Sequence, residues 1–422
     1  MDKERIRHAL RLLLIAALLV SAVLLARETG DYRRAFERIS GTAAETEESG
    51  EILPGLSAAE LARSVRPRTV LVRLPDGGTA ASAYAGEETE AAFHRFSAIL
   101  GEALGSAGEP EEIDENTFRA GLDAGCVFVD FFCNEPLGLL AHWLGSEMQS
   151  AAALSEARFL YLGLTDSAAQ LCFRGSDGGF FRCSTAAISE TLAARMAEMQ
   201  GVSAHFAYED PDLARLEPYT VLLAELPAIP SAAGFTVRDG IDTAELMRAV
   251  GMNSYVASSY LEADGTRVFI DGEKSLRIAP DATVTFRASP AEDGDRIAEG
   301  MQTAVSYACA AAVQSTGRYA GQAEILLTGV SFDGEDEYTV TFDYCIGGIP
   351  LRLTDGSAAQ IRLRGGQLVQ MNLVLRSYVL TGGTETLLPM RQAAAIANAS
   401  GVSPTLVYAD RGDRVECVWI RE

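Results

Sequence analysis

Hydrophobic and polar residues alternate in short segments along most of the chain, but one apolar stretch near the amino terminus is much longer. Residues 12–26 (LLLIAALLVSAVLLA) are fifteen apolar or small residues without a charge, and Ala9 and Leu10 extend them. A helix of roughly 20 apolar residues spans the ~30 Å hydrocarbon core of a bilayer. Arg11 and Arg27 flank the stretch and can extend their guanidinium groups to the two interfaces. We therefore predict a transmembrane helix over residues 9–27.

The charges around this stretch predict its orientation. Positively charged residues precede it, and such residues favour the cytoplasmic side of a membrane. The sequence thus predicts a single-pass protein of the cell membrane, with residues 1–8 as a cytoplasmic tail and an extracytoplasmic body. A cleaved signal peptide has a similar basic start and an apolar stretch of about 7–15 residues, with cleavage after Ala22 or Ala26 as the alternative here. A buried core helix is a third interpretation.

Residues 28–65 are mostly polar, with the acidic run AAETEESGE at their centre. This composition buries too little apolar surface to offset the entropy of ordering the chain. We predict a juxtamembrane stalk.

Residues 66–205 combine strand-like and helix-like patterns. Short apolar runs bounded by Gly, Pro and Asp predict strands, and apolar residues three or four positions apart predict helices. The predicted strands are 68–74, 126–132, 159–164, 169–174 and 179–183. The predicted helices are 87–104, 115–124, 137–144 and 189–199. Together they predict an N-terminal α+β domain.

Residues 206–290 begin with a proline-containing linker and end in three regularly spaced strands. A strand is expected at 219–225 and a helix at 243–250. The strands at 266–270, 275–278 and 283–287 are separated by turn residues and predict an antiparallel meander. We predict a central linker and β-meander domain.

Residues 291–422 show a helix, a run of strands, a second helix and two closing strands. The helices are expected at 297–312 and 390–399. The strands are expected at 323–328, 338–344, 349–353, 359–364, 368–376, 405–409 and 415–420. This order predicts a C-terminal α+β domain. For the whole body we expect α+β architecture, with mainly antiparallel sheets and helices packed on one face.

The charge of the chain argues against nucleic acid as a partner. The net charge is −23. The first 27 residues contain five basic and two acidic residues, a net +3, so the remainder carries −26. A body this acidic repels a phosphate backbone.

The cysteines do not suggest a metal site. There are seven, none in a CxxC pair, and only four histidines accompany them. Most lie in apolar runs typical of buried small side chains. Cys172 and Cys183 flank a Gly-rich turn, so that a disulfide across a hairpin and two free thiols are both possible from the sequence.

Motifs that carry chemistry are also missing from the sequence. There is no Gly-x-Ser-x-Gly around Ser331, no phosphate-binding loop and no HExxH. The acidic run 333–337 lacks the ligand spacing of an EF-hand and is better explained as a solvated hairpin tip. His94 and His142 lie beside aromatic residues, and Asp293 and Asp295 lie in a turn. We expect no catalytic residues, no metal and no cofactor, and hence no enzyme.

The predicted anchor itself carries small residues four positions apart, namely Ala17 with Ser21 and Ala22 with Ala26. Small residues at this spacing allow close approach of another membrane helix. These four residues are the predicted contact with a partner helix. The alternative is that alanine is simply common in short anchors.

The order of motifs resembles that of the YycH family. Residues 128–136 (FVDFFCNEP), followed by an apolar helix, are similar to the strand, proline and helix of that family, and residues 264–278 are similar to its central meander. Residues 338–344, 347–351 and 368–376 look like its C-terminal β unit. The family consists of membrane-anchored extracytoplasmic regulators of the essential cell-wall sensor kinase of Gram-positive bacteria.

The resemblance implies a non-enzymatic role in signal transduction. It implies regulation of a two-component sensor histidine kinase of the YycG or WalK type through transmembrane-helix and extracytoplasmic contacts, with a YycI-like protein as a further partner. It also implies a C-terminal domain similar to YycI and to PepSY-like folds. The alternative from the residues is an extracytoplasmic binding module for cell-wall material, a protease or a peptide.

Overall fold

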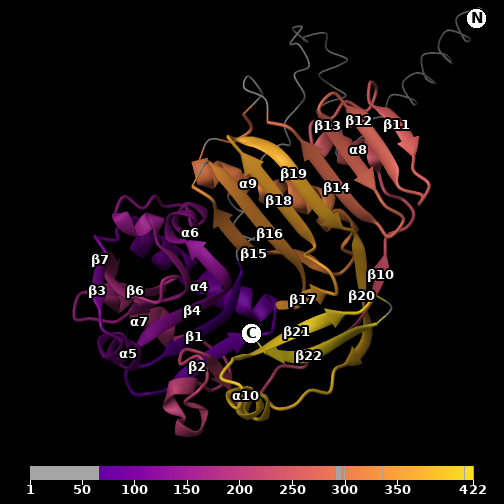
Figure 1. Ribbon diagram of the computed structural model, residues 1–422. Helices are drawn as coiled ribbons and strands as arrows, with labels where there is room; N and C mark the ends of the chain where they lie inside the picture. Colours follow the sequence, from indigo (N-terminus) through magenta and orange to yellow (C-terminus); the bar gives the residue numbers. More distant parts are fainter. Residues whose placement is uncertain (1–65, 291–295, 299, 335, 413, 422) are drawn as a thin grey trace, which may run out of the picture. The chain divides into compact units, whose positions relative to one another are not determined.

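A computed structural model describes residues 66–290, 296–298, 300–334, 336–412 and 414–421 (Figure 1). These residues contain seven α-helices and sheets that are almost entirely antiparallel. The predicted α+β architecture is therefore confirmed. The predicted anchor, tail and stalk lie outside the described residues, and the predicted division into domains stays a prediction. No helix in the described ranges has the length and apolar character needed to cross a membrane.

The first sheet has seven strands in the order β2-β1-β4-β5-β6-β7-β3. Its strands are β1 (Pro67–Arg73), β2 (Thr79–Ala83), β3 (Glu111–Ile113), β4 (Cys126–Pro136), β5 (Glu156–Gly163), β6 (Ala168–Gly175) and β7 (Phe180–Ile188). Valine, leucine and phenylalanine follow one another in β1 (PRTVLVR) and β4 (CVFVDFFCNEP), and both strands are buried on both faces over most of their length. Such strands require cover on each side of the sheet.

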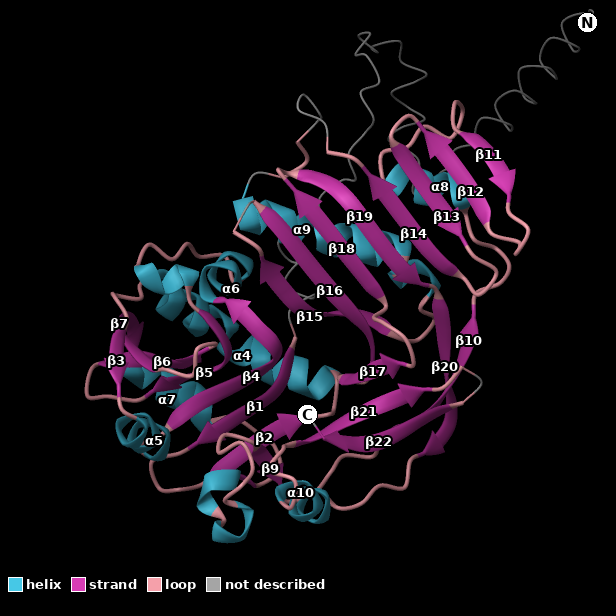
Figure 2. Ribbon diagram, viewed as in Figure 1, coloured by secondary structure: helices cyan, strands magenta, loops and turns pink. Residues whose placement is uncertain are grey.

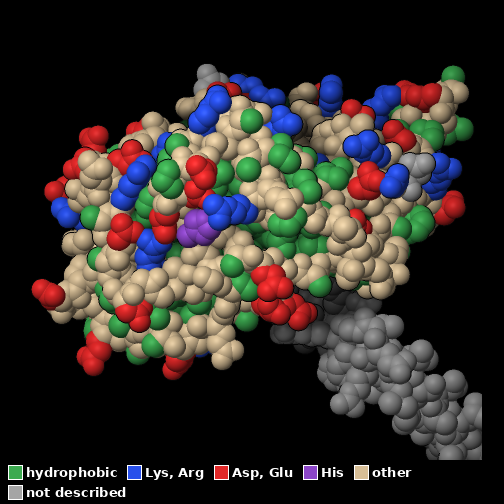
Figure 3. All heavy atoms as spheres, turned by 90° about the horizontal axis from the view of Figure 1, so that it is seen from below, with side chains coloured by type: hydrophobic (Ala, Val, Ile, Leu, Met, Phe, Trp, Pro, Cys, Tyr) green, Lys and Arg blue, Asp and Glu red, His purple; other side chains and the backbone are tan. Residues whose placement is uncertain are grey.

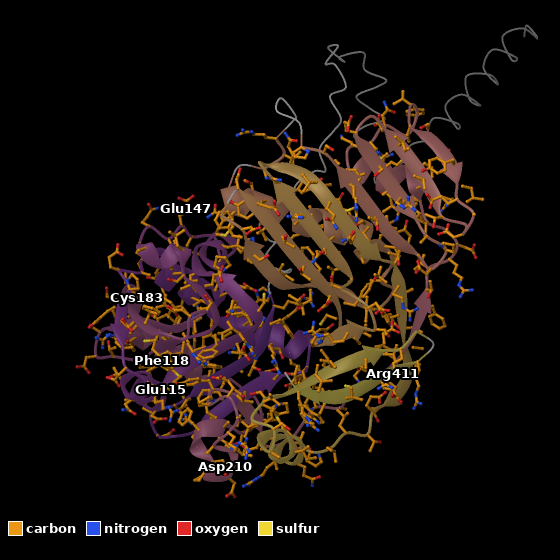
Figure 4. All side chains as sticks on the ribbon, in the orientation of Figure 1. Glu115, Phe118, Glu147, Cys183, Asp210 and Arg411 are labelled. Carbon is orange, nitrogen blue, oxygen red and sulfur yellow. The ribbon has the colours of Figure 1, made fainter. Side chains whose placement is uncertain are left out.

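Helices pack on both faces of this sheet. They are α4 (Glu87–Gly105), α5 (Glu115–Asp123), α6 (Leu137–Trp143) and α7 (Ser189–Ala197). Phe93 of α4 packs against Phe131 of β4, whereas Phe118 of α5 packs against Tyr161 of β5, which pairs with Phe128. Phe128 and Phe131 lie an odd number of positions apart, so they point to opposite faces. The expectation of helices on one face is therefore wrong for this sheet. Figure 4 labels Phe118 in this part of the molecule.

Strand β4 is interrupted by a bulge. Asp130 pairs with Phe159, but the next pair along β4 is Glu135 with Ala157. The extra residues let the strand continue to Pro136, whereas the sequence predicted a strand that ends at residue 132. A bulge changes the direction in which its side chains point.

A connecting segment leads from the first sheet to the second. It contains β8 (Ala204–Phe206), β9 (Val221–Leu223), β10 (Pro230–Thr236) and α8 (Thr243–Ala249), with short 3-10 turns at Ala207–Glu209 and Pro211–Leu213. Strands β8 and β9 pair with each other, and β10 pairs with β20 (Arg376–Thr384). The sequence did not predict β8 or β10.

The second sheet has eleven strands, with the order β11-β12-β13-β14-β19-β18-β16-β17-β21-β22 and β15 added beside β16 (Figure 2). The strands are β11 (Ser258–Leu261), β12 (Arg267–Asp271), β13 (Lys274–Ile278), β14 (Thr283–Ala288), β15 (Glu324–Phe332), β16 (Glu337–Ile346), β17 (Ile349–Leu353), β18 (Ala359–Arg364), β19 (Gln367–Val374), β21 (Pro404–Asp410) and β22 (Val415–Arg421). Only the β17–β21 pair in the described sheets is parallel.

One face of the second sheet is apolar and is covered by α9 (Gly300–Ser315). Strand β18 shows why, because its alternating sequence AQIRLR buries Ala359, Ile361 and Leu363 and exposes the residues between them. The small side chains of α9 let the helix lie close to the sheet, behind β16, β18 and β19 in Figure 2. The remaining helix, α10 (Met390–Asn398), packs near β21 and β9.

Candidate functional site

The outer edge of the second sheet is an unpaired strand. Strand β11 pairs with β12 on one side, and no described strand pairs with its other side. All four of its residues are exposed. An unpaired edge presents backbone N–H and C=O groups that can accept a strand from another chain.

Exposed apolar side chains surround this edge, and we call them the edge patch. Tyr255 is 96 % exposed and Leu261 is 68 % exposed. The other members are Val256, Tyr260 and Ile270. Isolated exposed apolar residues are common on soluble proteins, but a group of five around one strand edge indicates an interaction site.

The turn that carries Tyr255 is held in place by hydrogen bonds. The backbone N–H of Asn253 donates to Asp271 Oδ2 at 2.8 Å, and the backbone N–H of Tyr255 donates to Asn253 Oδ1 at 2.9 Å. Asp271 belongs to β12, so the turn is tied to the strand beside β11. The edge patch is therefore part of an ordered surface, which lowers the entropy that a partner must overcome on binding.

The face of the second sheet opposite α9 is polar. Paired residues place Arg287, Gln370 and Arg362 in one row across β14, β19 and β18. A neighbouring row contains Thr285, Asn372 and Gln360, and the amide of Asn372 lies 3.5 Å from Gln360 Oε1. Arg287 and Arg362 also line a shallow depression of about 470 Å³. This polar face is separate from the edge patch, because β12 and β13 lie between β11 and β14.

Glu337 interacts with two arginines of this polar face. Its side chain is mostly buried, forms an ion pair with Arg362, and lies 3.7 Å from Arg364 Nε through Oε2. The sequence predicted a solvated tip for the acidic run 333–337. That prediction is wrong for Glu337, which begins β16 and pairs with Arg364 of β18.

A carboxyl group outside this surface has an unusual environment. Glu135, at the end of the β4 bulge, is 2 % exposed, and its Oε2 atom has no hydrogen-bond partner. Burial raises the pKa of Glu135 to about 8. Burial, with Glu135 as a smaller contribution, also raises the pKa of the Cys133 thiol, whose sulfur lies 3.9 Å from Glu135 Oε1. The pair is protonated at neutral pH and therefore offers neither a base nor a thiolate.

The sequence-predicted partner contacts, Ala17, Ser21, Ala22 and Ala26, lie outside the described residues, as do Asp293 and Asp295. His94 is exposed on α4, and His142 is partly exposed on α6. Ser331 is exposed on β15, with Oγ 3.5 Å from the carbonyl oxygen of Thr339. None of these three lies on the edge patch. Among the described residues, no group of three His, Cys, Asp or Glu side chains is placed to hold a metal ion.

Cys172 and Cys183 are both free thiols in the structure. Cys172 pairs with Arg182 across β6 and β7, and Cys183 pairs with Leu171. The two thiols therefore point to opposite faces of the sheet, where they cannot form a disulfide. Burial raises the pKa of each thiol to about 11.

Reasoning from the sequence missed the edge patch. Its signal was present, since Tyr255, Val256, Tyr260 and Leu261 stand close together just before the Asp264-Gly265 turn. The same residues are compatible with a buried strand, and only the sheet order shows that β11 is at an edge.

The molecular face in Figure 3 shows acidic and basic side chains interspersed.

The chain matches no protein-family model, no curated protein and no solved structure at a significant level. The similarity to the YycH family rests on the motifs quoted above and stays a prediction.

Proposed function

We propose that this chain is a non-enzymatic, membrane-anchored regulator of a sensor histidine kinase of the YycG/WalK type, acting in the control of cell-wall metabolism. The observation that carries the proposal is the edge patch on the unpaired strand β11. Strand addition gives main-chain hydrogen bonds, and the flanking tyrosine and leucine side chains supply apolar contact. The main-chain hydrogen bonds and the apolar contacts would both bind another protein without catalysing a reaction.

The proposed anchor adds a second contact. Residues 9–27 form the transmembrane helix of the proposal, with the N-terminus in the cytoplasm and the body outside. A kinase helix could approach closely at either of two positions on this helix. One is formed by the small residues Ala17 and Ser21, and the other by Ala22 and Ala26. Anchoring in the same membrane raises the effective concentration of the body near its partner, so that a weak contact at β11 suffices.

Only a small difference in contact free energy is needed to shift the kinase between its states. A kinase with two nearly balanced states responds to any contact that differs between them by ~1–2 kcal/mol, the size of one interhelical polar contact. The proposal extends to a YycI-like protein as a further partner and to a C-terminal YycI- or PepSY-like domain.

The body contact is tested by co-purification of the full-length chain with the kinase from membranes. Tyr255→Lys combined with Leu261→Lys should weaken co-purification, because charged side chains block strand addition and remove apolar contact. The matched control is Leu154→Lys, since Leu154 is 84 % exposed but lies away from β11. Unchanged co-purification of the double variant contradicts the proposal.

The anchor contact is tested separately. Ala17→Leu with Ser21→Leu should weaken co-purification and alter kinase output, because the larger side chains keep the helices apart. Val23→Leu is the control, since it adds bulk on another side of the proposed helix. Normal kinase output after deletion of residues 1–27 counts against the proposal.

A second candidate function is an extracytoplasmic binding module for cell-wall material, a protease or a peptide. A polar cleft in the described residues favours it, with Arg68, Arg158 and Arg174 among its lining side chains. A shift in the melting temperature on addition of the ligand tests this function on the protein alone.

A further inference from the structure

A cleft of about 260 Å³ lies among residues that are far apart in the sequence. Arg158 and Asp130 come from β5 and β4, Arg174 is the next-to-last residue of β6, and Glu217 comes from the connecting segment. Ser403 and Pro404, at the start of β21, complete the wall. The bulge in β4 begins directly after Asp130 and places Asn134 at the cleft as well.

Two arginine side chains that line the cleft are hydrogen-bonded to carboxylates that also line it. Arg158 Nε donates to Asp130 Oδ1 at 2.9 Å, and Arg158 Nη2 donates to Asp130 Oδ2 at 3.3 Å. Arg174 Nη1 donates to Glu217 Oε1 at 2.7 Å. A guanidinium group has five N–H donors, so these bonds leave further donors on each arginine.

Arg174 shows this directly, because its Nε atom is buried and has no hydrogen-bond partner among the described residues. The side chain as a whole is 31 % exposed, so the donors of Arg174 within reach of a ligand are those that remain on its Nη atoms. Arg68 extends the same polar wall, with Nη2 donating to Thr405 Oγ1 at 3.2 Å.

The cleft also has an apolar side. Phe159 and Tyr219 are both buried, and their rings pack with centroids 5.1 Å apart. A few polar groups beside an aromatic wall are typical of sites for small molecules. The cleft is slightly smaller than the usual sites, which run from about 300 to 1,000 Å³, so it suits a small ligand or a single terminal group.

We propose that this cleft binds a small ligand, or the end of a peptide, through a carboxylate group held by Arg158 and Arg174. The proposal deepens the second candidate function above and rests on it. A guanidinium group that is already fixed in position can donate two parallel hydrogen bonds to the two oxygens of a carboxylate. The described lining has three arginines and two acids, an excess of one positive charge (3 − 2), in a chain of net charge −23. A single carboxylate balances that excess, whereas a phosphate dianion would be repelled by Asp130 and Glu217.

The test is calorimetric titration of the full-length chain in detergent with three probes. These are N-acetyl-Ala-Ala with a free carboxylate, the same dipeptide as its carboxamide, and inorganic phosphate. The carboxylate should bind at least tenfold more tightly than the other two. Arg158→Gln and Arg174→Gln should each weaken its binding at least tenfold, and Arg391→Gln on the surface of α10 should not change it.

Failure to bind the free dipeptide, equal binding of the carboxamide, or tighter binding of phosphate overturns the proposal. So does unchanged binding in both cleft variants. Asn134→Trp provides a variant that disturbs no ion pair, because Asn134 is exposed at the cleft. It should block binding while circular dichroism remains native. Because this assay contains no kinase, its failure leaves the co-purification result at β11 unaffected.

Discussion

Arg376 and Asp410 form a buried ion pair with two parallel hydrogen bonds. Arg376 Nε donates to Asp410 Oδ2 at 2.9 Å, and Arg376 Nη2 donates to Asp410 Oδ1 at 2.8 Å. Tyr378 Oη donates to Asp410 Oδ2 at 2.7 Å, and Arg376 Nη1 donates to Thr236 Oγ1 at 2.7 Å. Since these residues belong to β10, β20 and β21, the network joins the two-stranded sheet to the large one.

Removing one partner of this pair should be costly. We expect Asp410→Ala to lower the free energy of unfolding by about 3–5 kcal/mol, because it leaves the Arg376 guanidinium buried without its carboxylate. Urea denaturation measures the change. The control is Arg391, whose side chain is 72 % exposed and lies 3.0 Å from Asp210, and Arg391→Ala should cost about 0–1 kcal/mol. Similar losses in the two variants would contradict this account of the network.

A close approach of two glycines, one just before α4 and one in the turn between β16 and β17, gives another stability prediction. Gly348 has φ +79°, and a Cβ atom there would lie 2.9 Å from the backbone nitrogen of Gly86. Gly356 has a similar φ of +75° but has no atom within 4 Å of its Cβ position. Gly356→Ala should therefore cost only the strain of the left-handed conformation, about 1–2 kcal/mol. Gly348→Ala should cost clearly more in the same denaturation assay, and equal costs would show that the close approach is unimportant.

The sequence predicted individual elements well where periodicity was strong. The predicted helix 87–104 is α4, and the meander strands at 266–287 are β12, β13 and β14. Strand β2 was missed because TAASA has only small side chains and no apolar alternation. Residues 368–376 were predicted as one strand, but β19 ends at Val374 and β20 begins at Arg376.

Long-range pairing could not be predicted in the same way. Strand β14 pairs with β19 across 83 to 91 residues of sequence, from Arg287 with Gln370 to Thr283 with Val374, and β17 pairs in parallel with β21. The cleft arginines show the same limit, since Arg158 and Arg174 each resemble an ordinary surface charge until the fold brings them to one wall. Local patterns determine which residues form a strand, but tertiary packing determines which strands become neighbours and which become edges.

The aromatic cluster around Phe118 should dominate the stability of the first sheet. The ring of Phe118 lies 4.9 Å from that of Tyr161, 4.8 Å from Phe180 and 5.3 Å from Tyr219, measured between centroids. Phe118→Ala removes all three contacts and leaves a cavity, so we expect a loss of about 3–5 kcal/mol in the free energy of unfolding. Phe235→Ala, at a side chain that is largely exposed, is the control and should cost much less. A small loss for Phe118→Ala would mean that the cluster repacks.

Glu135 should make the stability of the protein fall as the pH rises. The pKa of its carboxyl is 4.5 in an ordinary environment and about 8 in the fold, because burial disfavours the charged form. Between these values the unfolded chain releases the proton and the folded chain keeps it. The stability is therefore complete below about pH 4.5 and is lost progressively up to about pH 8, by about 1.4 kcal/mol per pH unit from this group.

Glu135→Gln tests this linkage, because glutamine is close in shape and does not ionise. The variant should match the unmodified protein near pH 4.5 and exceed it by about 3–5 kcal/mol above pH 8, measured by urea denaturation across that range. Glu147→Gln, at an exposed position, should keep the original pH dependence because it leaves Glu135 in place (Figure 4). If Glu135→Gln and the unmodified protein lose stability in parallel as the pH rises, the carboxyl of Glu135 is ionised in the fold at neutral pH.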